Sequence, residues 1–117
     1  MICIEAVVRP ERISSVTAAL EEIGVPGFYY YNVTGQGRQR GVEVFVGRAG
    51  QTATRAAMQK TCIRTVVDDG MKDKVIDAII DASKSPGEGE IGDGKIFVTP
   101  MLDLARVRTN EREEAAL

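Results

Sequence analysis

The chain has 117 residues, 44% hydrophobic and 27% charged, with a net charge of −2 at pH 7. This composition predicts one globular domain, residues 1–117, with no apolar run near the roughly 18 residues of a membrane-spanning helix. The absence of histidine excludes histidine-dependent triads and histidine metal ligands. Cys3 and Cys62 form no Cys-x-x-Cys motif, so we expect buried, reduced thiols. Met1 leads directly into a strand pattern, which predicts no signal peptide and a cytoplasmic location.

The N-terminal part predicts a strand, a helix and a second strand. Apolar residues alternate with others from Ile2 to Arg9, the period of a strand with two different faces. Pro10 suits a first helical turn, and apolar residues then recur on one helical face until Gly24 ends the helix. The aromatic run within 27–33 favours the second strand.

The segment from Gly35 to about Gln59 carries no sustained core pattern. Alternate valines within 42–46 could extend a strand, and 54–58 could form a helical turn. A long excursion of this kind in a compact domain is usually functional.

The remaining elements complete an α+β pattern. Residues 62–67 predict a third strand, Asp68 or Asp69 can cap a helix that ends near Ser83, and 96–100 predict the last strand. The order β-α-β-β-α-β is typical of a ferredoxin-like fold, with two helices on one face of a four-stranded antiparallel sheet. The other face would expose Val7, tyrosines and Phe97, so we expect self-association through it.

A glycine–lysine turn precedes the last strand at residues 92–95. Glycine lets backbone N–H groups approach an anion, and the lysine adds a point charge. Residues 89–95 match the Gly-x-x-x-x-Gly-Lys half of a P-loop, but Ile96 stands where a magnesium-binding Ser or Thr belongs, and a strand pattern follows. The turn therefore predicts a phosphate cradle that is not a P-loop ATPase site, with a plain tight turn as the alternative.

Charge is distributed unevenly along the chain. Residues 35–64 contain six basic residues and one acid, Glu43, whereas 68–93 are mostly acidic. This favours a small anionic ligand or a defined protein partner over nucleic acid.

Two segments together, 35–41 and 91–98, followed by Arg106-Val107-Arg108-Thr109, resemble the PII family of nitrogen-regulatory signal proteins over essentially the whole chain. The resemblance implies a homotrimer, a sensor and not an enzyme, that binds ATP or ADP in clefts between subunits. It also implies a long loop at about 37–60 that contacts a target protein, either a membrane transporter or a metabolic enzyme, and a C-terminal tail at 101–117.

The resemblance further implies two sets of ligand contacts. The first set holds the nucleotide and comprises Gly35, Gly37, Arg38, Gln39, Val66, Gly92, Asp93, Gly94 and Lys95, with Arg106 and Arg108 from a neighbouring subunit. Arginine forks suit phosphate oxygens. The second set holds a small carboxylate, 2-oxoglutarate in many members, and comprises Arg9, Gln39, Arg40, Gly41 and Lys60. Gln39 would also bind the Mg²⁺ that accompanies ATP.

Several positions depart from the family pattern. Tyr29 stands where a small Thr is usual beside the adenine, and Arg64 replaces a usual acidic residue. The loop lacks the tyrosine that accepts a nucleotidyl group, and Ala49 replaces a phosphorylated serine, so covalent regulation is not expected. A divergent branch that responds to ADP or AMP with bicarbonate, linked to carbon uptake or carboxysomes, therefore stays open, as does a nitrogenase-associated branch.

Two other classes of function fit less well. An RRM-like RNA-binding domain would need glycine and aromatic positions that residues 95–98 lack. A small hydrolase or transferase would need a nucleophile and base beside Asp93, and the sequence offers no such pair.

Overall fold

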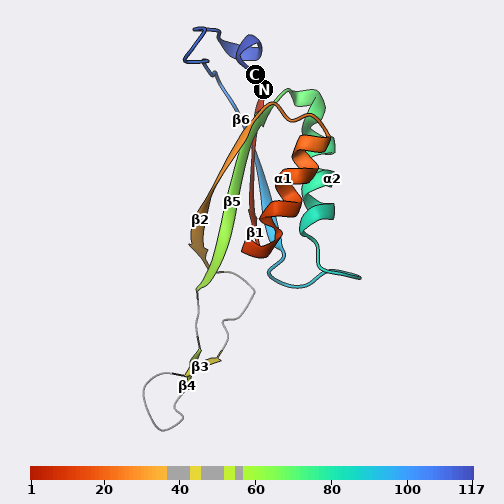
Figure 1. The fold of residues 1–117 in the computed structure, drawn as a ribbon, viewed down its shortest axis with the longest axis vertical. Helices are drawn as coiled ribbons and strands as arrows, with labels where there is room; N and C mark the ends of the chain where they lie inside the picture. The colour runs from red at the N-terminus through yellow and green to blue at the C-terminus, as the bar shows by residue number, and fades with distance from the viewer. Residues whose placement is uncertain (37–42, 46–51, 55–56) are drawn as a thin grey trace.

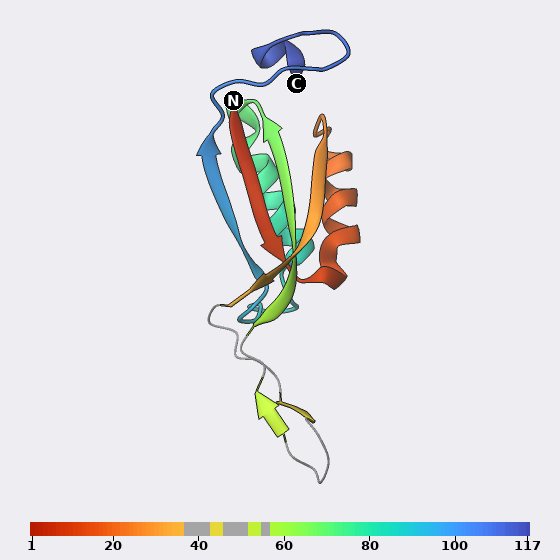
Figure 2. The same cartoon turned by 90° about the vertical axis from the view of Figure 1, so that its left-hand side faces the viewer.

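The computed structural model describes residues 1–36, 43–45, 52–54 and 57–117. Its main sheet has four strands in the order β2-β5-β1-β6, and all neighbouring strands are antiparallel. The helices lie together on one face of this sheet (Figures 1 and 2). The predicted α+β ferredoxin-like fold is therefore confirmed. The strands are β1 (Ile2–Val8), β2 (Phe28–Gly35), β5 (Met58–Val67) and β6 (Gly94–Pro100), and the helices are α1 (Ile13–Glu22) and α2 (Lys72–Ser83).

Short elements complete the described part of the chain. One-turn 3-10 segments, η1 (Pro10–Arg12) and η2 (Asp69–Met71), lead into the two helices, and η3 (Glu113–Ala116) lies in the tail. β3 (Glu43–Phe45) and β4 (Thr52–Thr54) pair with each other. None of the helices in the described ranges has the length and apolar character to cross a membrane.

The core lies between the sheet and the two helices. The alternation in β1 directs every second side chain toward the helices, whose apolar stripes cover them. Burying these apolar surfaces against each other is the main force that holds the two layers together. The fully buried members are Ile4, Ala6, Val8, Val16, Leu20, Ile63, Val67, Val75 and Ile79.

The opposite face of the sheet is open in the single chain. Tyr29 and Phe97 are 56% and 47% exposed, which confirms the prediction of exposed aromatic side chains there. The Arg64 guanidinium lies 5.8 Å from the centre of the Tyr29 ring and 3.3 Å from a Glu5 carboxylate oxygen. Tyr29 and Arg64, two of the departures from the family pattern, are direct cross-strand partners. Both cysteines are buried and unpaired, as expected.

Three predicted details were wrong. The third strand begins at Met58 instead of residue 62, because pairing with β2 extends it into the segment expected as loop. The predicted helical turn at 54–58 fails at both ends, since Thr54 belongs to β4 and Met58 to β5. Neither Asp68 nor Asp69 caps the second helix with its side chain. The Asp69 carboxylate pairs instead with the Met1 amino group at 3.0 Å, a tertiary contact that competes with capping.

Candidate functional site

The carboxylate of Asp93 closes the loop between α2 and β6. It accepts hydrogen bonds from the Ser85 hydroxyl at 2.6 Å, from the Ser85 and Glu90 backbone N–H groups at 2.9 Å each, and from Arg9 Nε at 3.3 Å. Burial opposes its ionisation, but these donors outweigh burial and hold the pKa of Asp93 well below its usual range. Asp93 is therefore an anion that organises its own loop.

Two cations hold the backbone just before Asp93. Arg9 Nη2 donates to the Ile91 carbonyl at 3.0 Å, and Lys60 Nζ donates to the Gly92 carbonyl at 2.7 Å. Burial, with the positive charge of Arg9, lowers the pKa of Lys60. Arg9 and Lys60 were predicted to bind a small carboxylate. In this structure both donate to the loop that precedes Lys95, the predicted phosphate site.

Gly94 brings the loop against β1. Its φ is +141°, and a Cβ at this position would lie 2.3 Å from the Val7 carbonyl oxygen. Any side chain would therefore collide with the neighbouring backbone where β6 begins pairing with Val8. The sequence predicted that glycine here lets the backbone approach an anion. The structure adds a second reason for Gly94, which is its close contact with the backbone of β1.

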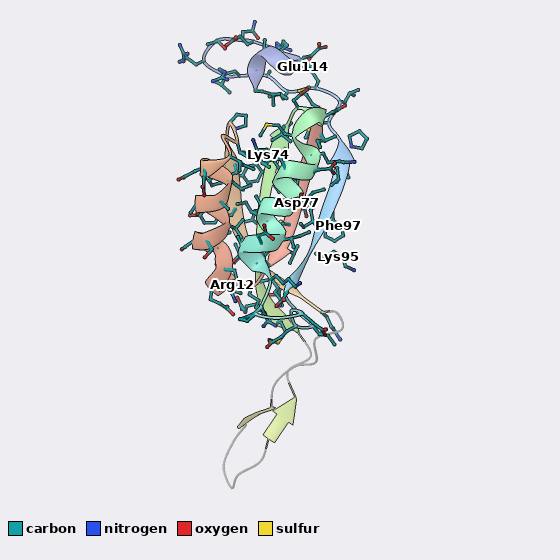
Figure 3. All side chains as sticks on the ribbon, turned by 90° about the vertical axis from the view of Figure 1, so that its right-hand side faces the viewer. Arg12, Lys74, Asp77, Lys95, Phe97 and Glu114 are labelled. Atoms are coloured by element: carbon teal, nitrogen blue, oxygen red, sulfur yellow. The ribbon has the colours of Figure 1, made fainter. Side chains whose placement is uncertain are left out.

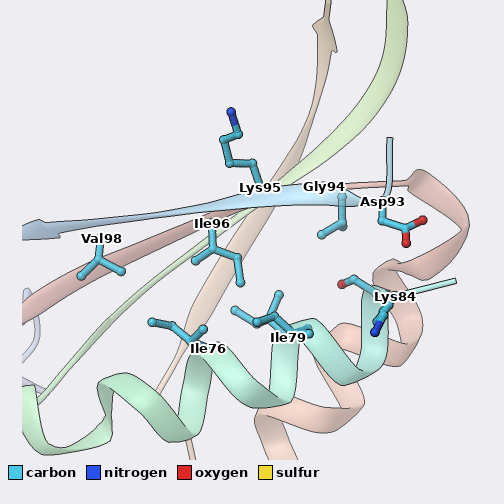
Figure 4. A pocket seen from close by; sticks show the side chains of 11 residues that line it. Ile76, Ile79, Lys84, Asp93, Gly94, Lys95, Ile96 and Val98 are labelled. Carbon is cyan, nitrogen blue, oxygen red and sulfur yellow. The ribbon is translucent and has the colours of Figure 1, made fainter. Parts of the chain in front are cut away.

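A hollow of about 600 Å³ lies beside this loop on the open face of the sheet. Lys95 extends from β6 on the side away from α2 (Figure 4). Phe97, two residues further along the strand, shares that face and lies near Lys95 in Figure 3. The hollow brings together six of the predicted site residues with Gln36, at the start of the long excursion. The six are Gly35, Lys60, Gly92, Asp93, Gly94 and Lys95. Cationic groups and glycine backbone around one hollow suit an anion of phosphate size.

A second groove, between α2 and β6, differs in chemistry. Its volume is about 340 Å³ and its lining is dominated by isoleucine and valine, among them Ile76, Ile79 and Val98 (Figure 4). Lys95 points away from it to the other face of β6. Ser83, Lys84 and Asp93 also line this groove, but its surface is mainly apolar, so we do not take it as the candidate site.

The predicted tail residues lie at the other end of the sheet. The loop at 85–93 and the tail stand at opposite ends of β6 (Figures 1 and 2), and a strand of that length spans about 20 Å. Val66 and Arg106 line a separate hollow of about 390 Å³ there. Arg106 Nη2 donates to the main-chain oxygens of Leu117 and Ala116 at 2.7 and 3.2 Å. Within one chain the structure does not bring Arg106 to Lys95.

Other predicted residues are placed less fully. Arg108 is exposed in the tail. The other predicted site residues lie outside the described ranges: Gly37, Arg38, Gln39, Arg40 and Gly41.

Two partners of Asp93, Ser85 and Glu90, were not among the predicted site residues. Ser85 follows a helix end and precedes Pro-Gly, the setting in which a short hydroxyl side chain often stabilises a turn, so this signal was available. Glu90 contributes its backbone N–H, which no side-chain pattern reveals.

The fold and this loop define a small ferredoxin-like domain with a glycine–lysine turn suited to an anion. A sequence profile described as "Nitrogen regulatory protein P-II" matches residues 1–111. Proteins of that name from Synechocystis sp. and Nostoc punctiforme are 38% and 39% identical to this chain over 115 residues. Each alignment covers 97% of this chain and 97% of the relative. A third, from Microchaete diplosiphon, is 38% identical over the same length. The chain belongs to the PII family of nitrogen regulatory signal-transduction proteins.

Proposed function

We propose that this protein is a cytoplasmic homotrimer that binds ATP or ADP together with 2-oxoglutarate and regulates a protein of nitrogen metabolism through the loop at about 37–60. Membership of the PII family supports the regulatory role. One observation carries the choice of ligand: the glycine–lysine turn, Lys60 and the start of the long excursion line a single hollow.

The phosphates occupy the hollow beside Lys95. Its ammonium supplies the charge, and the glycines on either side of Asp93 leave the backbone accessible to phosphate oxygens. If ATP carries Mg²⁺, Gln39 would be its protein ligand, because a side-chain carbonyl oxygen is among the hard donors that suit Mg²⁺.

A neighbouring subunit completes this site. The tail that carries Arg106 and Arg108 and the loop before Lys95 stand at opposite ends of β6 (Figure 1), so the two arginines would reach these phosphates from another copy. The open sheet face, with Tyr29, Tyr31 and Phe97 exposed, supplies the apolar surface that such an assembly covers.

The carboxylate ligand enters through Lys60 and Arg9. Both cations already donate to loop carbonyls, so a carboxylate that draws Lys60 from the Gly92 carbonyl changes the cradle that holds the phosphates. The two ligands are therefore coupled, and linkage requires that each alters the affinity of the other by the same factor.

The test is a calorimetric matrix of ATP, ADP and AMP against 2-oxoglutarate and bicarbonate. We expect ATP binding that 2-oxoglutarate changes and that Lys95→Ala weakens at least tenfold, about 1.4 kcal/mol. Lys74→Ala, which removes an exposed lysine from α2, is the matched control and should bind as the wild type does.

Two outcomes would overturn this assignment. If Lys95→Ala binds ATP as tightly as the wild type, the phosphates do not bind beside Lys95. Coupling of ADP or AMP to bicarbonate, with none to 2-oxoglutarate, replaces the nitrogen-linked ligand with the carbon-linked one.

A further inference from the structure

The Asp93 side chain is directed at its own loop. Its carboxylate is 17% exposed, and its acceptor positions are taken by Ser85, Glu90 and Arg9. A residue bound in this way influences a ligand through the shape of the loop. The resemblance implies that Asp93 contacts the nucleotide, and the hydrogen bonds in this structure connect its carboxylate to the loop itself.

Ser85 is the main partner of that carboxylate. It is buried, and it donates both its hydroxyl, at 2.6 Å, and its backbone N–H, at 2.9 Å. Hydrogen bonds to a charged acceptor are the stronger class in proteins. The pair therefore ties the end of α2 to the residue that precedes β6.

The intervening chain is closely packed around this contact. Gly89 has a φ of +81°, and a Cβ there would lie 3.0 Å from Asp93 Oδ2 and 3.2 Å from side-chain carbons of Lys84. A side chain at residue 89 would therefore crowd both Asp93 and Lys84, and the positive φ would strain it further.

The same contact fixes the peptide groups of the cradle. Arg9 bonds Asp93 through Nε and the Ile91 carbonyl through Nη2, so the carboxylate holds the guanidinium that holds the carbonyl. In a trans peptide the C=O and the following N–H point in opposite directions. Fixing the Ile91 carbonyl on Arg9 therefore also fixes the direction of the Gly92 N–H.

We propose that Ser85 and Asp93 are positioning residues that hold residues 91–94 ready for the phosphates of a nucleotide, with Arg9 as the link between them and the backbone. The inference rests on the proposed function for the identity of the ligand. The physical basis is preorganisation. A loop that already has the binding conformation binds a ligand more tightly, because no free energy is spent on ordering it when the ligand binds.

The chain offers a matched control two residues away. The Ser83 hydroxyl is also buried, but it has no hydrogen-bond partner within the described part of the protein. Ser83→Ala and Ser85→Ala therefore remove the same atom from neighbouring buried sites, and only the second breaks the contact with Asp93. Ser85→Thr keeps the hydroxyl and serves as the rescue variant.

The experiment measures ATP affinity by calorimetry and loop hydrogen exchange by mass spectrometry on the full-length protein. We expect Ser85→Ala to weaken ATP binding about tenfold, the value of one hydrogen bond to a charged group. Ser85→Thr should stay within about twofold and Ser83→Ala should match the wild type. Equal ATP affinity in Ser85→Ala and Ser83→Ala would overturn the inference, as would failure of Ser85→Thr to restore binding.

Hydrogen exchange separates this inference from the proposed function. In the ligand-free protein, residues 86–93 should exchange about tenfold faster in Ser85→Ala than in Ser83→Ala. If the wild type binds no ATP, the proposed function fails, and equal loop exchange in the two variants overturns the positioning role separately. Asp93→Asn replaces Ser85→Ala in both measurements if the latter fails to fold, judged by circular dichroism.

Discussion

Replacing Gly94 with alanine tests how tightly β6 is bound to β1. The new Cβ would lie 2.3 Å from the Val7 carbonyl oxygen and 3.3 Å from both the Val7 carbonyl carbon and the Val8 Cα, all of them backbone atoms. Since none of these is the end of a flexible side chain, the start of β6 must move away from β1. The φ of +141° adds strain for any residue that carries a Cβ.

The magnitude follows from these two effects. Backbone strain at a glycine-only conformation costs about 1–3 kcal/mol, and each ladder hydrogen bond lost at the strand end costs about 1 kcal/mol. Gly94→Ala should therefore lower the free energy of unfolding by about 3 kcal/mol. Among the strands that the structure describes, β6 pairs with β1 alone, so none of them holds its other edge in place.

The assay is urea unfolding at fixed protein concentration, followed by circular dichroism. Gly27→Ala is the control, because a Cβ at residue 27 meets no atom within 4 Å and its φ is not in the left-handed region. Its stability should change by less than about 0.5 kcal/mol. Equal stability of the two variants would refute the argument that close approach of β1 requires Gly94.

Three further predictions concern other contacts of the loop, the tail and the cysteines. Asp93→Asn should destabilise the protein by about 2 kcal/mol at pH 7, because four donor groups lose a charged acceptor. The folded-state pKa of Asp93 is depressed, so its contribution is complete above the unfolded value of 3.8 and is lost as pH falls below it. Urea unfolding should accordingly show the difference from the wild type narrowing below about pH 4, and a constant difference down to pH 2.5 would contradict this linkage. Arg106→Ala should release the last residues of the tail, because Arg106 holds the main-chain oxygens of residues 116 and 117, whereas Arg108→Ala should not. Hydrogen exchange of 111–117 measures this, and equal exchange in the two variants would argue against the contact. Cys3 and Cys62 are buried, and burial raises the pKa of the Cys62 thiol, so a thiol reagent at pH 8 should label both about 100-fold more slowly in the folded protein than in urea. Rapid labelling of either cysteine under native conditions would show that the open sheet face leaves it accessible.

The local elements were largely readable from the sequence. The alternation of residues 2–8 and the helical spacing of α2 both depend on which side chains are buried, and burial patterns repeat within a few residues. The early start of β5 was not readable, because residues 58–60 become a strand only by pairing with β2. The ion pair of Asp69 could not be predicted either, because its partner is the Met1 amino group, 68 residues away in the sequence.

The sequence by itself determined the order of the elements, the glycine–lysine turn and the family of this protein. Short-range spacing carries all of these, since backbone conformation and burial act over neighbouring residues. Only the tertiary structure decided which partners the charged side chains take. Arg9 meets Asp93 across 84 residues of sequence, and Lys60 meets the Gly92 carbonyl across 32. Such contacts depend on strand order, which brings the end of β1 and the start of β6 together, and no local pattern contains that information.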